Sequence, residues 1–237
     1  MTPPPPRPDR SPGGLADLLI ETEAAQLRAL ERPVTVSAGS TLYEERAPYA
    51  YAFVVQEGVL ILERLSSEGR RQVLAFAYPG DFMGFDLAGR YLCSAVALTD
   101  VRLAAYPAGK LTALAEQHAG IDRALKTVTS RILAFALDQI CVLGRLNARE
   151  RLAYGLLHLH HRQQGDDART TGWGGIDLPM TRPDLADFLG LTPETVSRTL
   201  SKLRRDGLLQ LDDHGHRATA DLDGLKALLD LPESTRV

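Results

Sequence analysis

Hydrophobic and polar positions repeat with two different periods along this 237-residue chain. From residue 33 to 107, short apolar or alternating runs are interrupted by turn residues every ten or so positions, which is typical of a small antiparallel barrel or jelly roll. Residues 15–31 before this region have helical spacing, and residues 109–118 after it predict a short helix. The first half of the chain is therefore predicted to form a β-roll with flanking helices.

A long helical pattern follows, from about residue 121 to 146, and it carries two apolar stripes. The first stripe repeats in alternating steps of three and four residues, as in a coiled coil, and comprises Leu125, Val128, Ile132, Phe135, Gln139, Val142 and Leu146. The second stripe comprises Leu133, Leu137 and Ile140. We assign the first stripe to pairing with the same helix of a second subunit, and the second to covering the barrel. The alternative is a core helix that packs only within its own chain.

The last third of the chain predicts a winged helix-turn-helix. Residues 147–162 read as a helix and IDLPM as a short strand, and two helices then meet at Gly190, where glycine permits a sharp turn. Thr192 suits the N-cap of the second helix and Pro193 its first position. Two short strands around a turn at 213–215 form the wing, and LDGLKALLD forms a closing helix. The alternative is a pair of surface helices without function.

One face of the second helix is suited to DNA. Val196, Leu200 and Leu203 form its buried side, and the opposite side carries hydrogen-bonding and cationic groups. Arginine can bond bidentately to guanine, glutamate can accept from cytosine N4, and basic or hydroxyl side chains can contact phosphate. The residues assigned to the DNA backbone are Thr181, Thr192, Thr195, Ser201, Lys202 and Arg205.

Composition narrows the class of protein. The net charge is −3 and the pI about 6.1, so nucleic-acid binding has to come from a local basic patch. Two cysteines far apart in sequence argue against a disulfide scaffold and favour the cytoplasm, and we identify no apolar run of membrane-spanning length. The expected α+β organisation is a disordered proline-rich tail at 1–14, a β-roll at 15–118, a dimerisation helix at 119–146 and a winged helix-turn-helix at 147–237.

Three segments resemble the Crp/Fnr superfamily of bacterial transcription regulators: PGDFMGFDLAG (79–89), NARERLAYGLL (147–157) and LPMTRPDLADFLGLTPETVSRTLSKLRRDGLL (178–209). Glu194, Ser197 and Arg198 are similar to the Glu-x-x-Ser-Arg motif of its FNR/FixK branch. The resemblance implies a homodimeric, cytoplasmic, non-enzymatic regulator that works with RNA polymerase and has no membrane partner. It also implies that Glu194, Ser197 and Arg198 read the half-sites of a TTGAT-N4-ATCAA palindrome in double-stranded DNA.

The ligands expected from this resemblance do not match the sequence of the β-roll. The cyclic-nucleotide pocket of the superfamily needs a glutamate for the ribose and an arginine for the phosphate, and Phe85 and Tyr91 stand at those positions. Arg90 is adjacent, but on a strand it would point to the opposite face. Because a buried phosphodiester without a cation is very unfavourable, we expect no cAMP. Two remote thiols also exclude the four-cysteine iron–sulfur cluster of FNR itself.

Several modes of control stay open. The leading expectation is a constitutive dimer without cofactor or metal. One alternative is oxidation of Cys141 or Cys93, although both can equally be small buried hydrophobes. Another is haem, for which the histidines available are His118, His158, His160 and His161. Outside this class, a cupin-like enzyme needs histidines on the barrel strands, and residues 33–107 contain none. A protein-interaction module without DNA readout is the last alternative.

Overall fold

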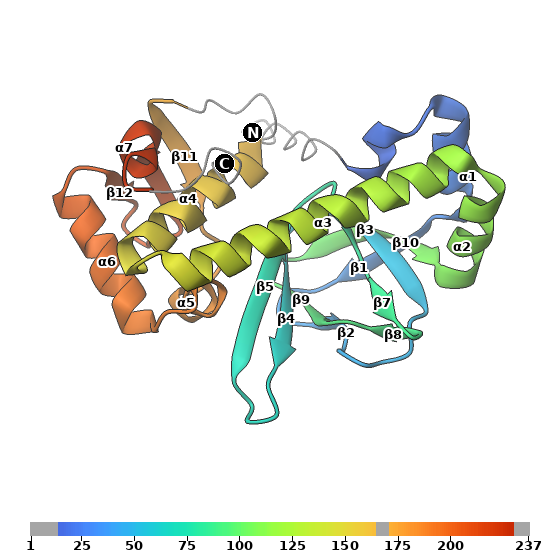
Figure 1. Cartoon of the computed structure of the whole chain (residues 1–237), viewed down its shortest axis with the longest axis horizontal. Helices are drawn as coiled ribbons and strands as arrows, with labels where there is room; N and C mark the ends of the chain where they lie inside the picture. The colour runs from blue at the N-terminus through green and yellow to red at the C-terminus, as the bar shows by residue number, and fades with distance from the viewer. Residues whose placement is uncertain (1–13, 165–170, 230–237) are drawn as a thin grey trace, which may run out of the picture.

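The computed structural model describes residues 14–164 and 171–229. All but the last residue of the predicted tail, 1–14, lies outside these ranges. The described part consists of a β-roll, a long helix and a smaller C-terminal α/β unit (Figure 1). This architecture agrees with the α+β class predicted from the sequence.

The β-roll is built from two antiparallel four-stranded sheets. In spatial order, the first sheet contains β1 (Arg32–Val36), β10 (Val101–Pro107), β3 (Tyr51–Glu57) and β6 (Phe82–Met83). The second contains β2 (Thr41–Tyr43), β9 (Ser94–Ala97), β4 (Leu60–Leu65) and β5 (Arg71–Ala77). A small hairpin joins β7 (Asp86–Leu87) to β8 (Arg90–Tyr91). The flanking helices are η1 (Leu15–Leu18), α1 (Glu21–Leu30) and α2 (Ala108–Gln117). Side chains that alternate inward from both sheets, such as Val55, Leu60 and Leu103, form the core between them.

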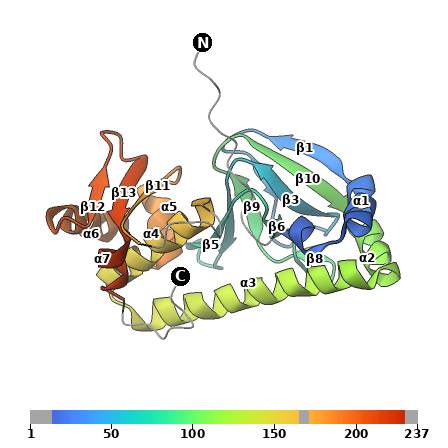
Figure 2. The same ribbon diagram turned by 90° about the horizontal axis from the view of Figure 1, so that it is seen from above.

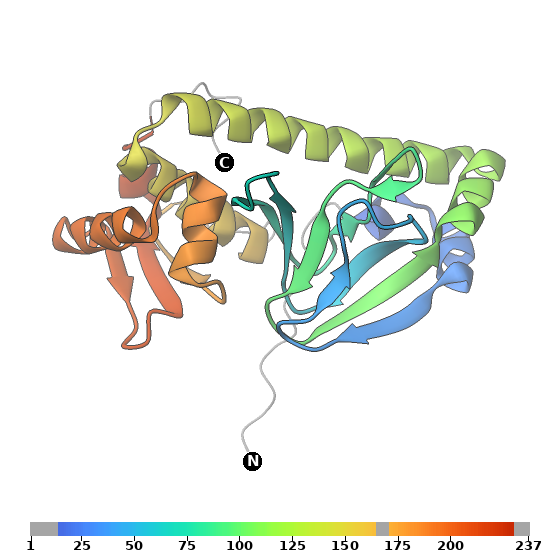
Figure 3. The same ribbon diagram turned by 90° about the horizontal axis from the view of Figure 1, so that it is seen from below.

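Helix α3 (Ala119–Arg145) runs along one long side of the molecule, with the β-roll and the C-terminal unit both on the same side of it (Figures 2 and 3). Near its start, Ala124 and Val128 pack against the first sheet and the N-terminal helices. Near its end, Val142 and Leu146 join a second core that also contains Phe76 of β5. Helix α3 therefore connects the two units through its packing as well as through the chain.

The burial of the two apolar stripes of α3 is the reverse of the prediction. Of the first stripe, Val128, Gln139, Val142 and Leu146 are buried within the chain, Leu125 and Phe135 are partly buried, and only Ile132 is exposed. The second stripe, expected to cover the barrel, is instead the open one: Leu133, Leu137 and Ile140 are 61%, 55% and 67% exposed. Heptad spacing identifies two faces on one helix but does not say which partner each face meets.

Among the described residues, α3 is also long and apolar enough by composition to cross a membrane, contrary to our expectation from the sequence. Its two apolar stripes together produce this composition. One of the two stripes packs against the protein's own cores.

The C-terminal unit has the order of elements of a winged helix-turn-helix: α4 (Ala148–Gln164), β11 (Trp173–Asp177), α5 (Arg182–Leu189), α6 (Pro193–Arg205), β12 (Leu209–Leu211), β13 (Arg217–Asp221) and α7 (Leu222–Lys226). Its antiparallel sheet has the order β11-β13-β12. The predicted strand IDLPM (176–180) overlaps β11 only in its first two residues. Leu178 and Met180, which lie between β11 and α5, are buried in the core. The wing is the β12–β13 hairpin, as predicted.

Candidate nucleic-acid interface

Helix α5 begins with a reciprocal capping box. Thr181 caps the helix by accepting the backbone N–H of Asp184 at 3.2 Å, and Asp184 accepts the backbone N–H of Thr181 at 2.8 Å. Pro183 follows at the start of the helix, where its missing N–H costs no hydrogen bond. Together these residues fix the start of α5 and leave Thr181 at the surface.

The turn between α5 and α6 depends on Gly190. Its φ of 60° and ψ of 43° are left-handed, and a Cβ there would lie 3.1 Å from Cδ2 of Leu143. Arg151 of α4 holds this turn against the end of α3: its guanidinium donates to the carbonyls of Leu189 and Gly190 in the turn, and to those of Leu143 and Leu146 at the end of α3. The amphipathic pattern does not reveal this role of Arg151, because all four acceptors are backbone atoms.

Helix α6 presents its polar face to solvent. Thr192 caps it by accepting the N–H of Thr195 at 3.2 Å. Val196, Leu200 and Leu203 are buried on one side, as predicted, and this anchors the helix on α4 and α5. The polar side chains proposed to contact DNA are exposed, apart from the half-buried Thr195: Thr192, Glu194, Ser197, Arg198, Ser201, Lys202 and Arg205. The helix therefore offers one continuous polar surface.

The base-reading candidates have suitable electrostatics. The pKa of Glu194 is lowered chiefly by its own backbone N–H at the helix N-terminus, then by the hydroxyl of Thr192 and the charge of Arg198. Glu194 is thus a carboxylate that only accepts hydrogen bonds, which suits the amino group of cytosine. Arg198 lies one turn further along the same face, with Nη2 3.4 Å from Oγ1 of Thr195. Ser201 donates to the carbonyl of Ser197 at 2.9 Å, so its hydroxyl is free only to accept.

The first helix also carries a cation that the sequence analysis missed. Arg182, the first residue of α5, donates from Nη2 to the carbonyl of Gly215 in the wing at 3.3 Å. Arg182 therefore joins the exposed N-terminus of α5 to the wing, beside the hydroxyl of Thr181. Its position immediately after the N-cap Thr181 could have indicated a contact with the DNA backbone, because helix N-termini attract phosphate.

Aromatic side chains lie at the positions of the β-roll that correspond to the cyclic-nucleotide pocket of the superfamily. Tyr91 is buried and stacks on Tyr43 with ring centroids 4.0 Å apart. Its hydroxyl donates to the carbonyl of Tyr51 at 2.9 Å. Arg90 points the other way, as predicted, and donates to the carbonyl of Arg46 at the surface. Phe85 packs edge-on against Phe82. The prediction that Tyr91 and Arg90 point to opposite faces is confirmed.

The two cysteines lie in different environments. Burial raises the pKa of the Cys93 thiol to about 11, with the charge of Glu45 adding to the effect. Such a thiol is protonated at neutral pH and is a poor nucleophile. Cys141 is exposed on α3. Cys93 lies in the bend between β8 and β9 and is half-buried, so Cys141 is the more accessible of the two thiols.

Two histidines near the end of α4 pack inside the protein. His158 stacks on Phe135 with ring centroids 4.9 Å apart, and burial lowers its pKa to about 3, with Arg162 and His161 contributing. The ring of His160 is buried, with Nδ1 3.0 Å from the carbonyl of Gly175. Within the described residues, no group of three or more His, Cys, Asp or Glu side chains is arranged to hold a metal ion.

Comparison with known proteins agrees with this geometry. The cyclic nucleotide-binding domain family matches residues 33–118, and the Crp-like helix-turn-helix domain family matches residues 150–228. The nitrogen fixation regulation protein FixK of Bradyrhizobium diazoefficiens is 37% identical over 209 residues, which cover 87% of this chain and 86% of that protein. The chain belongs to the Crp/Fnr family.

Other members of the Crp/Fnr family support the same placement. The transcriptional activatory protein AadR of Rhodopseudomonas palustris is 36% identical over 174 residues, covering 73% of this chain and 71% of that protein. The structure of FixK2 from Bradyrhizobium japonicum superposes with a TM-score of 0.78 at 30% identity, covering 85% of this chain and 98% of that one. This Crp/Fnr protein is thus a DNA-binding transcription regulator of the FixK-like type, and its relatives are regulators rather than enzymes.

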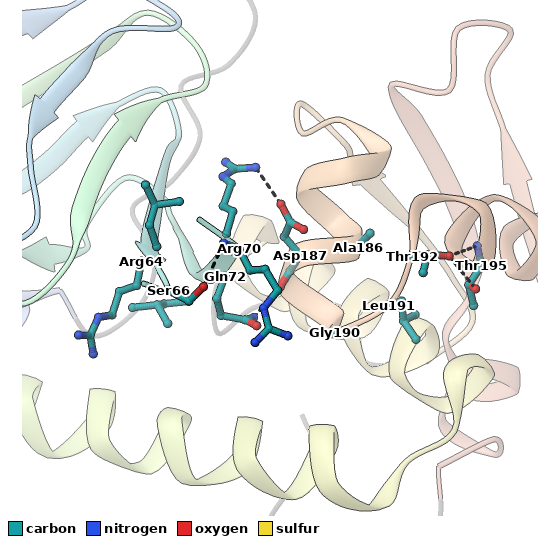
Figure 4. A pocket seen from close by; sticks show the side chains of 13 residues that line it. Arg64, Ser66, Arg70, Gln72, Ala186, Asp187, Gly190, Leu191, Thr192 and Thr195 are labelled. Carbon is teal, nitrogen blue, oxygen red and sulfur yellow. Dashed lines mark hydrogen bonds and ion pairs between the residues drawn. The ribbon is translucent and has the colours of Figure 1, made fainter. Parts of the chain in front are cut away.

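In this regulator, an open cleft of about 1070 Å³ lies between the β4–β5 hairpin and the turn of the helix-turn-helix (Figure 4). Arg64 and Arg70 line it from the hairpin, and Thr192 and Thr195 line it from α6. Arg64 is already paired with Glu45 at 2.7 Å, and Arg70 with Glu68 at 3.0 Å. The cleft marks where the β-roll reaches the DNA-binding unit.

Proposed function

We propose that this regulator binds DNA as a homodimer and reads a TTGAT-N4-ATCAA-like palindrome. The observation that carries the proposal is the exposed polar face of α6, on which Glu194, Ser197 and Arg198 follow one another within a single turn. Arg198 suits the guanine of TTGAT and Glu194 the cytosine on the opposite strand, while Ser197 lies between them for a thymine. Phosphates are contacted by the remaining polar residues of the face and by Thr181 and Arg182.

The exposed stripe of α3 supports the homodimer. Ser130, Leu133, Leu137, Ile140 and Gly144 follow at steps of three and four residues, so they lie in one row along the helix. A Cβ at Gly144 would meet nothing within 4 Å, which leaves room for a second helix to approach closely. A two-fold pair of these helices would place the two recognition helices roughly 34 Å apart, one turn of B-DNA.

We further propose that DNA binding requires neither a nucleotide nor an iron–sulfur cluster nor haem. The stacked Tyr43 and Tyr91 occupy the place where a phosphodiester would need a cation. Such a protein would act in the bacterial cytoplasm with RNA polymerase, and the operator position would decide between activation and repression.

Fluorescence anisotropy with a TTGAT-N4-ATCAA duplex tests the proposal. We expect salt-dependent, specific binding that is lost when both half-sites are scrambled. Arg198→Ala should weaken binding by at least about thirtyfold, because each base contact contributes about 1–3 kcal/mol and the dimer has two. Arg28→Ala, an exposed arginine on α1, is the control for loss of one positive charge. Equal affinity for the scrambled duplex, or no effect of Arg198→Ala, would refute the palindrome, whereas no binding to either duplex would favour a protein-interaction module.

An absorbance spectrum of protein purified without oxygen tests the cofactor-free state. We expect no band above 300 nm. A Soret band would show haem, and absorption near 400 nm with bound iron would show a cluster. DNA binding after peroxide treatment is the further readout: sensitivity that disappears in Cys141→Ser or Cys93→Ser would show a thiol switch instead.

A further inference from the structure

The guanidinium of Arg71 in strand β5 joins the β-roll to the first helix of the helix-turn-helix. It contacts three carboxylates: Nε donates to Glu63 at 2.5 Å, and Nη1 donates to Asp184 at 2.6 Å and lies 3.2 Å from Asp187. Glu63 lies on the neighbouring strand β4, whereas Asp184 and Asp187 belong to α5, 113 and 116 residues further along the chain. One side chain thus ties two strands of the β-roll to the DNA-binding unit.

Asp184 has two roles at this contact. Its Oδ2 accepts the backbone N–H and the hydroxyl of Thr181, while its Oδ1 accepts Arg71. Burial raises the pKa of Asp184, but the hydrogen bonds from Thr181 and Arg71 outweigh this effect and leave it below its usual range. The carboxylate that caps α5 is therefore also the acceptor that docks α5 on β5.

Two further contacts between β5 and α5 fix the orientation of α5 on the β-roll. Gln72 donates from Nε2 to the carbonyl of Asp187 at 2.5 Å. Phe76 meets Phe188 edge-on, with ring centroids 5.2 Å apart. These contacts lie along one side of α5 and oppose rotation of the helix about its own axis. Since α6 packs against α5 across the tight turn at Gly190, the orientation of α5 determines the orientation of α6.

We propose that Arg71 is a positioning residue for DNA readout. It does not touch DNA, but it fixes the angle at which the β-roll and α3 present the recognition helix. In a homodimer this angle sets the separation of the two recognition helices, and therefore the spacing between half-sites that the protein accepts. Removing the guanidinium leaves Glu63, Asp184 and Asp187 close together without their shared cation, so the carboxylates repel one another and α5 shifts.

The inference rests on the proposed palindrome, and spacer selectivity tests it on the full-length protein. Anisotropy is measured with duplexes whose half-sites are separated by three, four or five base pairs. The wild type should prefer four. Arg71→Ala should bind the four-base-pair site at least about tenfold more weakly, a factor equal to 1.4 kcal/mol, and should discriminate less between the three spacers. Arg71→Lys should be intermediate, because an ammonium cannot bridge Glu63 and Asp184 as the planar fork does.

Arg70→Ala is the matched control, since the adjacent Arg70 is exposed and pairs only with Glu68 among the described contacts. It should behave as wild type. An Arg71→Ala variant with wild-type affinity and spacer preference would overturn the inference, and so would a loss of affinity by the same factor at all three spacers. If Arg71→Ala does not fold, as judged by thermal melting, the same measurements on Arg71→Lys decide.

Hydrogen exchange separates failure of this inference from failure of the palindrome. In DNA-free protein, Arg71→Ala should accelerate exchange of the backbone amides of α5, while those of the β-roll core remain protected. Unchanged exchange in α5 would overturn the role of Arg71 whatever DNA the protein binds. A wild-type protein that binds no palindrome, combined with faster exchange in the variant, would overturn the proposed function and leave the docking role of Arg71 supported.

Discussion

Truncation of the exposed stripe of α3 gives the sharpest test of the dimer. Leu137 is 55% exposed, so a partner helix has about half of its side-chain surface left to bury. Complete burial of a leucine contributes roughly 2 kcal/mol, so Leu137→Ala should remove about 1 kcal/mol per protomer and about 2 kcal/mol per dimer. The dimer dissociation constant should rise by about thirtyfold.

Analytical ultracentrifugation over a range of protein concentrations measures this constant. Leu92→Ala is the control, because Leu92 is 42% exposed and lies between strands β8 and β9 of the β-roll, outside α3. Val142→Ala provides the opposite comparison: Val142 is completely buried on the other face of α3, so its truncation should lower the free energy of unfolding by about 2 kcal/mol and leave dimerisation unchanged. A dimer that resists Leu137→Ala but dissociates with Val142→Ala at unchanged folding stability would refute the assignment of faces.

Three further predictions concern the turn, the cap of α5 and the thiols. Gly190→Val should lower the unfolding midpoint and abolish DNA binding, because a branched side chain in a left-handed turn is strained and meets Leu143; urea denaturation checks this. Asp184→Asn should lower the free energy of unfolding at neutral pH. The difference from wild type should shrink as the pH falls through the lowered pKa of Asp184, because protonation removes the stabilisation that the carboxylate provides. Urea melts at pH 7 and pH 3 measure this difference. Iodoacetamide at pH 8 should alkylate Cys141 and spare Cys93, whose pKa is about 11; modification of Cys93 first, by peptide mass mapping, would contradict the burial argument.

Sequence periodicity predicted local structure well and partners poorly. Strand alternation correctly placed Tyr91 inside and Arg90 outside, because neighbouring residues of a strand point to opposite faces. The same kind of reasoning found both stripes of α3 but did not show which of them packs against the chain's own cores, since the period carries no information about which surface is opposite. The exposed polar face of α6 could be predicted because its side chains share one helix of thirteen residues.

The contacts between units were outside the reach of such patterns. Arg71 and Asp184 are 113 residues apart, and neither breaks the pattern of its own element. Only the fold brings them together. His158 is a related case: it was one of the histidines available to haem, but its ring stacks on Phe135, which the sequence of α4 alone cannot show.

The four hydrogen bonds of Arg151 imply an uneven tolerance to substitution around the joint between α3 and the helix-turn-helix. Because every acceptor is a main-chain carbonyl, exchanging Leu143, Leu146 or Leu189 for another apolar residue leaves the acceptors in place. Exchanging Arg151 removes all of the bonds at once. A mutational library selected for operator binding should therefore accept several residues at each of those leucines and retain almost exclusively arginine at 151.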